Sequence, residues 1–161
     1  MKQTVNLKLK MSEIIYDIQN KTYLTGRSLE NGTNHSHVAN LQANDDDENA
    51  AQVLRSVTMA VGILCNRIAE YLEGGQGNAV NDSLSADDDI SMGLSLPSNF
   101  NPAVAQTIGE AAHEFIVAKS VAEWFAITAK GETSDYNTVA ENALKVLEEA
   151  LCKRSRPVRG E

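Results

Sequence analysis

The sequence predicts a mainly α-helical protein, a bundle of three to four helices with a small two-stranded β-ribbon. Three observations lead to this fold class. The 161-residue chain is 42% hydrophobic but only 5% aromatic, which favours closely packed helices of small aliphatic side chains over a β-sandwich. Apolar residues recur every three or four positions in three long segments, as in helices that bury one face. Two short segments alternate apolar with polar residues instead, which is the period of a half-buried strand.

The alternating segments predict strands at residues 4–11 and 90–96. Their apolar positions are Val5, Leu7, Leu9 and Met11 in the first strand, and Ile90, Met92, Leu94 and Leu96 in the second. Nothing else nearby resembles a strand, so we expect the two to pair with each other. A lone two-stranded ribbon is only marginally stable. We therefore expect a helix against its apolar face, or strands of neighbouring subunits along its edge.

The segments between these elements are less regular. Ser12 is expected to cap a short helix that ends near Gly26, although the alternation of Ile14 and Ile18 also fits a strand. Residues 28–44 are polar and rich in asparagine, which predicts a loop. Residues 74–89 contain few apolar side chains and many Gly, Asp and Ser residues, and they predict a mobile surface loop.

The long apolar segments predict three helices, which span residues 46–73, 102–129 and 135–152. The first follows the acidic run Asp45–Glu48, whose carboxylates oppose the positive end of the helix dipole. The second opens with Asn101 as cap and Pro102 at the first helical position, and the third with Ser134 as cap. The apolar seam of the first helix is expected at Ala50, Leu54, Val57, Val61, Leu64, Ile68 and Tyr71.

Residues 1–152 are expected to form a single helical domain, and residues 153–161 a basic C-terminal tail. The tail holds Lys153, Arg154, Arg156 and Arg159 against Glu161, a charge of +3. The whole chain carries −8, so the remaining 152 residues carry −11 (−8 − 3). An acidic body argues against wholesale coating of nucleic acid. The tail is typical of a local contact device; the alternative is that its charges only stabilise the end of the last helix.

The titratable residues do not predict an enzyme. Glu110 and His113 match the Glu-x-x-His motif of di-iron bundles, but that site needs two copies. The apolar seam of the same helix includes Ile108, Ala111 and Phe115. Relative to these residues, Glu110 and His113 are expected on the solvent side of the helix. His35 and His37 would need further ligands to hold zinc, and neither run of three aspartates has the glycine-centred spacing of a calcium loop. No nucleophile with an oriented base is recognisable. We expect no catalytic residue, no cofactor and no metal.

The cysteines and the N-terminal residues indicate the compartment. Cys65 and Cys152 have no paired spacing, as expected of free thiols in a reducing compartment. Residues 1–4 lack the apolar region of a signal peptide, and nowhere do 18 apolar residues run together. We expect a soluble protein, made inside a cell and without contact with a membrane.

The last third of the chain combines several segments in the order of a known family. They are Leu94–Asn101 (LSLPSNFN), His113–Val117 (HEFIV), Val121–Phe125 (VAEWF), Asp135-Tyr136 and Lys153–Pro157 (KRSRP). In this combination the chain resembles the small virion proteins of tailed bacteriophages and prophages. It is similar in particular to head–tail connector (neck adaptor) proteins, over residues 90–159.

The resemblance implies a helical virion subunit that forms a homo-oligomeric ring on the portal and seats the tail, while phage DNA passes without sequence specificity. The tail-docking segment maps onto Lys153, Arg154, Arg156, Pro157 and Arg159. The Trp-Phe pair of the family maps onto Trp124 and Phe125, as interface anchors or as core residues.

Two other functions stay open. The first ninety residues depart from compact connectors, which leaves a tail-completion protein as a further virion role. A small intracellular adaptor or regulatory module that binds one protein through its helical seams is the alternative from another class.

Overall fold

In the computed structural model, which describes residues 2–74 and 77–159, five α-helices and a two-stranded sheet form the described chain. The elements are β1 (Lys2–Leu9), α1 (Met11–Ser28), α2 (His35–Ala39), α3 (Asp47–Arg67), β2 (Ile90–Pro97), α4 (Ala105–Thr128) and α5 (Thr133–Leu151). Short 3₁₀ turns lie at Ala69–Tyr71, Pro102–Val104 and Lys130–Glu132. The predicted fold class, mainly α with a small β-ribbon, is confirmed.

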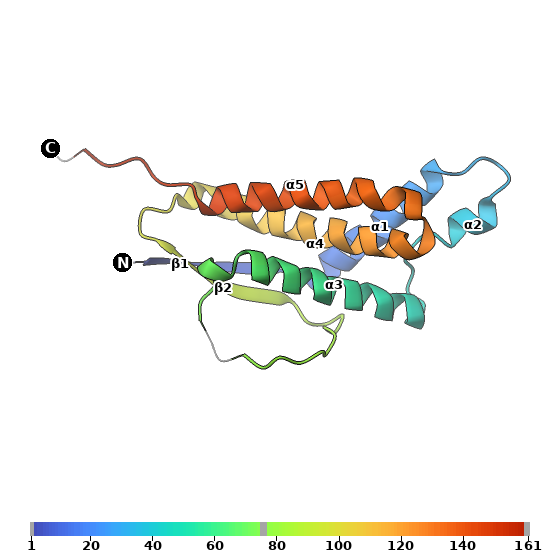
Figure 1. Ribbon diagram of the computed structural model, residues 1–161, viewed down its shortest axis with the longest axis horizontal. Coiled ribbons are helices and arrows are strands. Elements are labelled where there is room, and N and C mark those ends of the chain that lie inside the picture. The colour runs from blue at the N-terminus through green and yellow to red at the C-terminus, as the bar shows by residue number, and fades with distance from the viewer. Residues whose placement is uncertain (1, 75–76, 160–161) are drawn as a thin grey trace.

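Helix α4 lies at the centre of the bundle. It contacts α1, α3, α5 and β1, and α3, α4 and α5 run along the long axis of the molecule (Figure 1). Twelve of its 24 residues are buried, and they are spread around the helix instead of forming a stripe. A helix that is apolar on all sides is stable only when other elements cover it. The remaining elements therefore pack around α4.

The two predicted strands pair with each other, in antiparallel register with Leu7 opposite Met92 and Leu9 opposite Ile90. The face that packs on the bundle is formed by Leu7, Leu9, Leu94 and Leu96, all at most 5% exposed. The first strand spans residues 2–9 instead of the predicted 4–11, because Met11 already belongs to α1. The carboxylate of Asp89 accepts a hydrogen bond from the Met11 backbone N–H (3.1 Å), which satisfies one free donor at that helix end.

The short helix expected after Ser12 is an 18-residue helix, and the strand alternative is wrong. Its buried residues are Met11, Ile14, Ile18, Thr22 and Gly26, a stripe with helical spacing. The cap prediction is also wrong. Helix α1 starts before Ser12, and its N-cap residue is Lys10, whose side chain makes no capping bond.

The polar segment 28–44 is only partly a loop, because it contains α2 and two core residues. Leu41 and Ala43 are 1% and 0% exposed. A Cβ on Gly26 would lie 3.2 Å from the Val38 carbonyl oxygen, so glycine allows α2 to approach α1 closely. The few apolar side chains of this polar segment determine where it packs. The overall asparagine-rich composition did not indicate them.

The apolar seam of α3 is only partly the predicted one, because Val57, Leu64 and Ile68 are buried as expected but the rest of the stripe is shifted. Val53, Val57, Ala60 and Leu64 are buried, whereas Leu54 and Val61 are only partly buried. Both faces of this helix carry aliphatic residues, and the position of α4 selects between them. The helix ends at Arg67 instead of residue 73, and a 3₁₀ turn follows.

The other two helix starts differ in their caps. Asn101 caps the Pro102–Val104 turn that leads into α4, since its Oδ1 accepts a hydrogen bond from the Ala103 N–H (3.0 Å). That prediction is confirmed. Ser134 lies inside α5, which begins one residue earlier, and the residue before that helix makes no capping bond.

The second predicted loop has no helix or strand in its described residues 77–89. Hydrogen bonds from several of its residues hold it against α3. Arg55 donates to the Asn81 carbonyl oxygen (2.7 Å), and Thr58 Oγ1 accepts from the Leu84 N–H (2.9 Å). Residues 75–76 of the predicted loop lie outside the described residues. Across the described ranges, no helix is both long and apolar enough to span a membrane.

Candidate functional site

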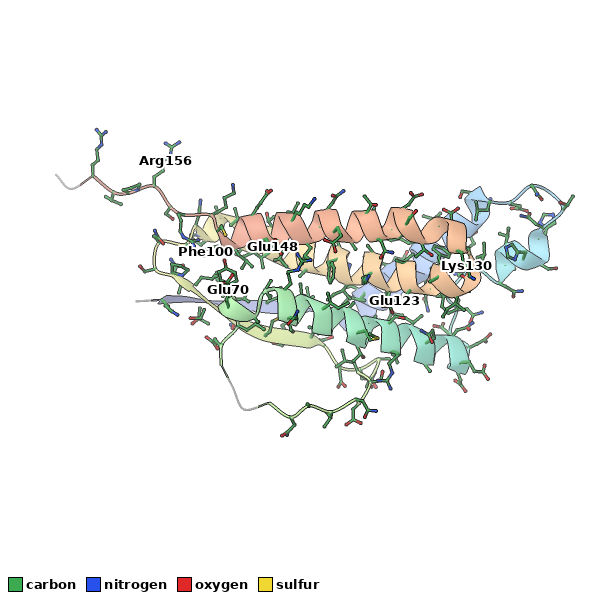
Figure 2. All side chains as sticks on the ribbon, viewed as in Figure 1. Glu70, Phe100, Glu123, Lys130, Glu148 and Arg156 are labelled. Atoms are coloured by element: carbon green, nitrogen blue, oxygen red, sulfur yellow. The ribbon has the colours of Figure 1, made fainter. Side chains whose placement is uncertain are left out.

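The first residues of the basic tail are fixed to the body. The chain from Lys153 to Ser155 runs antiparallel beside Asn99–Asn101, with the Ser155 N–H donating to the Asn99 carbonyl (2.7 Å) and the Asn101 N–H to the Lys153 carbonyl (3.1 Å). The fully buried ring of Phe100 lies at this point (Figure 2). These contacts form a rigid base for whatever follows Ser155.

Two further contacts stabilise this base. Arg154 donates from Nη1 to the carbonyl oxygens of Leu151 (2.9 Å) and Lys153 (3.1 Å), at the end of α5. Tyr71 and Cys152 form a hydrogen bond of 3.7 Å, and this bond raises the pKa of Tyr71 to about 12. The two hydrogen bonds of Arg154 thus bind its guanidinium group within its own subunit. A cation at the C-terminus of a helix is expected to make such contacts.

Residues 156–159, which we call the arm, are exposed and form no hydrogen bond or ion pair with the described part of the chain. Figure 2 shows Arg156 pointing away from the bundle. Val158 is 95% exposed. Residues 160–161 of the predicted tail lie outside the described residues. Of the five predicted docking residues, Lys153 and Arg154 form the base, whereas Arg156, Pro157 and Arg159 are free for a partner.

Trp124 and Phe125 belong to the core of the subunit. Trp124 is 5% exposed, and its Nε1–H donates to the Leu41 carbonyl oxygen (2.6 Å). Phe125 is fully buried and packs against the Tyr136 ring, with 5.7 Å between ring centroids. Of the two roles expected for this pair, the core role describes their position. They cannot serve as interface anchors while the subunit is folded, because no partner can reach them.

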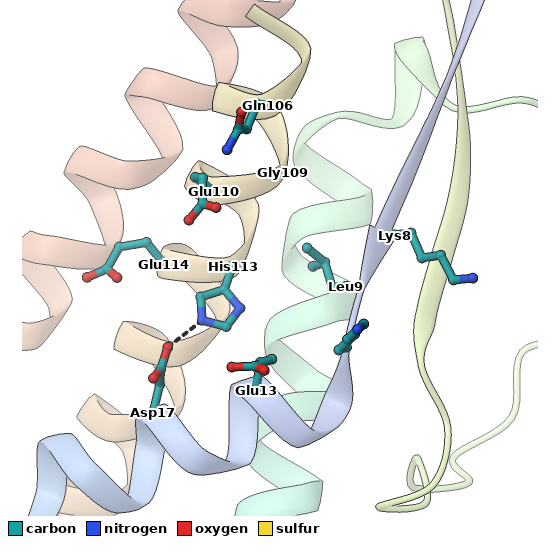
Figure 3. Close-up of a pocket in the computed structure, with 10 residues that line it drawn as sticks. Lys8, Leu9, Glu13, Asp17, Gln106, Gly109, Glu110, His113 and Glu114 are labelled. Carbon is teal, nitrogen blue, oxygen red and sulfur yellow. Dashed lines mark hydrogen bonds and ion pairs between the residues drawn. The ribbon is translucent and has the colours of Figure 1, made fainter.

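A groove of about 590 Å³ lies between β1, α1 and α4. Its lining is mainly charged and includes four carboxylates and two lysines (Figure 3): Lys8, Leu9, Lys10, Glu13, Asp17, Gln106, Gly109, Glu110, His113 and Glu114. Helix α1 supplies Glu13 and Asp17 four residues apart, and α4 supplies Glu110 and Glu114 with the same spacing. Each pair lies on one face of its helix, and the fold brings the two faces together.

His113 does not point into solvent, contrary to the prediction. Its Nε2 lies 2.6 Å from Asp17 Oδ2, and its side chain is only 19% exposed. The seam of α4 is broader than expected, so α1 covers a face that a single stripe would leave open. Glu110 is exposed as predicted. The His113–Asp17 pair joins α1 to α4, which gives this histidine a structural contact within the subunit.

A second hollow of about 550 Å³ adjoins the first along α4. The two share Gln106, Glu110 and Glu114. The second is more apolar, since Ala103, Ala111, Ala143 and Val146 line it beside the shared polar residues. Together the two hollows form one surface along α4 with carboxylates in the middle and aliphatic side chains toward α5. We call this surface the α4 groove.

The candidate metal ligands are dispersed. Within the described residues, no group of three or more His, Cys, Asp or Glu side chains could hold a metal ion. His35 pairs with Glu30, and Asp45 accepts a hydrogen bond from Gln19 Nε2 (2.7 Å). Burial raises the pKa of the Cys65 thiol.

The sequence did not indicate Lys8, Lys10, Glu13 or Asp17 as members of any site. The only signal was the four-residue spacing of the carboxylates on each helix. That spacing predicts which residues share a face, but it cannot say that two faces meet across a groove.

Comparison with protein-family models, with curated proteins and with solved structures found no match. The geometry described above is therefore the basis for any function assigned to the chain.

Proposed function

We propose that this chain is a structural subunit of a tailed-phage virion, a head–tail connector (neck adaptor) that forms a homo-oligomeric ring on the portal. The observation that carries the proposal is the arm. Arg156 and Arg159 are held out from the bundle on a rigid base and have no partner among the described residues. Ordering a segment costs conformational entropy, and contacts with another chain offset that cost best when the base is already fixed.

The charge distribution supports a protein partner for the arm. The body carries −11 and the segment 153–161 carries +3, so surfaces of opposite sign occur on one molecule. Opposite charges steer two copies together. An acidic body also repels the phosphate backbone, which suits a ring through which DNA slides without binding.

The β-ribbon offers a second contact between subunits. Among the described residues, β1 pairs only with β2, so its other edge presents backbone N–H and C=O groups without strand partners. Such an edge accepts an added strand from another chain. Lys2 and Lys8 of β1 and the following Lys10 are exposed, and lysines on an edge strand limit indiscriminate pairing.

The test is the mass of the purified chain at concentrations on the order of tens of micromolar, where micromolar self-association is populated. We expect a defined oligomer by sedimentation equilibrium, rings by negative-stain electron microscopy, and binding to a portal protein encoded beside its gene. A strictly monomeric chain that also fails to bind that portal would contradict the proposal.

The same preparation separates the rival functions. An adaptor or regulatory module would be monomeric and would bind one cellular protein instead of the portal. A tail-completion protein would bind tail proteins and leave the portal free. Portal, terminase and capsid genes beside this gene would support either virion role over the adaptor.

A further inference from the structure

We infer that the arm of one copy docks in the α4 groove of a neighbouring copy, with Arg156 and Arg159 on the groove carboxylates and Val158 on its aliphatic wall. This contact rests on the proposed self-association and names the surfaces that form it. It requires no residue outside the described chain.

The charges of the two surfaces are complementary. Glu110 is exposed at the centre of the groove and has no ion pair within the described ranges, whereas Glu114 contacts Lys21 at 3.8 Å. Arginine forms two parallel hydrogen bonds with a carboxylate. Of the two groove lysines, Lys8 extends away from α4 in Figure 3. Glu13 is likewise exposed without an ion pair among the described residues, but Glu110 lines both hollows and therefore lies beside the aliphatic wall that receives Val158.

The spacing of the two arginines in the arm is similar to the spacing of the two carboxylates on α4. Positions 110 and 114 are separated by about 6 Å along one face of α4, from a rise of roughly 1.5 Å per residue. An extended segment with three residues per turn places Arg156 and Arg159 on one face, about 9 Å apart. Long arginine side chains span the difference. Val158 then lies on another face of the arm.

The apolar part of the groove fits that second face. Val158 is 95% exposed and Val146 on α5 is 45% exposed. Val146 lines the groove beside Ala111 and Ala143. Burying Val158 and Pro157 there removes apolar surface from water on both copies, which favours association.

The arm points away from the groove of its own subunit, although its base lies beside the end of that groove at Ala103. Its base is fixed by the pairing of Ser155 with Asn99, and Figure 1 shows the chain leaving the end of the bundle away from α4. Pro157 restricts its own φ angle and keeps Arg156 extended, which opposes a sharp reversal. An arm that reaches the next copy makes a head-to-tail contact, the type that closes into rings.

A charge-swap experiment tests this contact. The variants are Glu110→Arg in the groove, the double variant Arg156→Glu/Arg159→Glu in the arm, and all three changes together. We expect each of the first two to weaken self-association by at least about tenfold, because opposed charges replace charge-assisted pairs. The combined variant restores association, since the signs are exchanged and complementary again. Sedimentation equilibrium measures all four proteins.

The matched control is Asp82→Arg, which makes the same change of charge on an exposed side chain of the 77–89 loop, outside both hollows of the α4 groove. It should leave association within about twofold, as expected for a charge outside the contact. Circular dichroism and thermal unfolding confirm that every variant is folded. If the wild-type chain associates but Glu110→Arg behaves like the control, the docking site is wrong while the proposed function stands. If the wild-type chain is monomeric, the docking contact is wrong, and if that monomer also fails to bind the portal, the proposed function is wrong as well.

A photo-crosslinking residue in place of Val158 distinguishes a neighbouring copy from the same copy. In a mixture of ¹⁴N- and ¹⁵N-labelled protein, docking between copies gives mixed-isotope crosslinks to peptides from residues 102–119 or 139–151. If these peptides give only single-isotope crosslinks and no mixed ones, the arm folds back on its own subunit. Crosslinks to any other peptide place it elsewhere. Either of these results overturns the inference.

Discussion

Helix α4 and the arm are the two extremes of this molecule. Half of the α4 residues are buried, and elements on several sides cover the helix. The arm is exposed along its whole length and contacts none of the described chain outside its base. The difference shows that the two regions find their contacts in different places. Apolar residues with helical spacing satisfy each other within one subunit, whereas a stiff, charged and exposed segment has its partners elsewhere.

The largest expected loss of stability comes from a substitution in the buried helix α4. Trp124→Ala should lower the free energy of unfolding by about 3–5 kcal/mol, because it leaves a cavity in the core. It also removes the hydrogen bond to the Leu41 carbonyl. Urea unfolding followed by circular dichroism measures the loss. Arg156→Ala is the exposed control and should change stability by less than about 0.5 kcal/mol when all chains are unfolded at a concentration low enough to be monomeric. Equal losses of unfolding free energy for the two substitutions would contradict the assignment of Trp124 to the core and of the arm to the exposed surface.

A smaller effect is expected where a polar group serves the core. Thr22 Oγ1 donates to the Ile18 carbonyl (2.8 Å) and accepts from the Ala43 N–H (3.0 Å). Thr22→Val keeps the shape and removes the hydroxyl, so it should cost about 1–3 kcal/mol by leaving a buried N–H without a partner.

Thr138→Val is the matched control for that change. The Thr138 hydroxyl donates only to the Ser134 carbonyl of its own helix (3.0 Å) and is exposed. This variant should stay within about 0.5 kcal/mol of the wild-type chain in the same unfolding experiment. A loss at Thr22 no larger than the one at Thr138 would mean that segment 40–44 is not held to the core through this hydroxyl.

The smallest expected loss of stability comes from removing a side-chain cap at the start of a helix. Asn101→Ala removes the side-chain cap on the Ala103 N–H and should cost about 0.5–2 kcal/mol. Ser134→Ala tests the cap that the sequence predicted and the fold does not use, and we expect almost no loss. Thermal unfolding of both variants side by side measures the difference. A larger loss for Ser134→Ala would reinstate the predicted cap.

Patterns that depend on neighbouring residues were predictable from the sequence. Helical spacing identified the three long helices, strand alternation identified the ribbon, and the Asn101-Pro102 pair identified a true cap. These features rest on local backbone geometry, which the residue types themselves set. The ribbon pairing followed because the two longest segments that alternate apolar with polar residues were each other's best strand partners.

Features that depend on the packing of distant segments were not predictable. The buried stripe of α3 is Val53, Val57, Ala60 and Leu64 because α4 lies on that side, and the sequence has aliphatic residues on both. Leu41 is a core residue because its segment packs against α1 and α4, where it lies close to Gly26 and accepts a hydrogen bond from Trp124. The α4 groove exists because α1 crosses near His113. Spacing along one helix carries no information about which other helix it will meet.

The most direct test of the central claim, that the arm acts between subunits and not within one, compares the intact chain with a chain shortened after Ser155. Both are measured by sedimentation equilibrium and by urea unfolding at the same protein concentration. We predict a defined oligomer for the intact chain. For the shortened chain we predict a monomer whose own unfolding free energy is within about 0.5 kcal/mol of an intact chain kept monomeric by Glu110→Arg. The same oligomer with and without the arm, or a shortened chain that no longer folds, would contradict the claim.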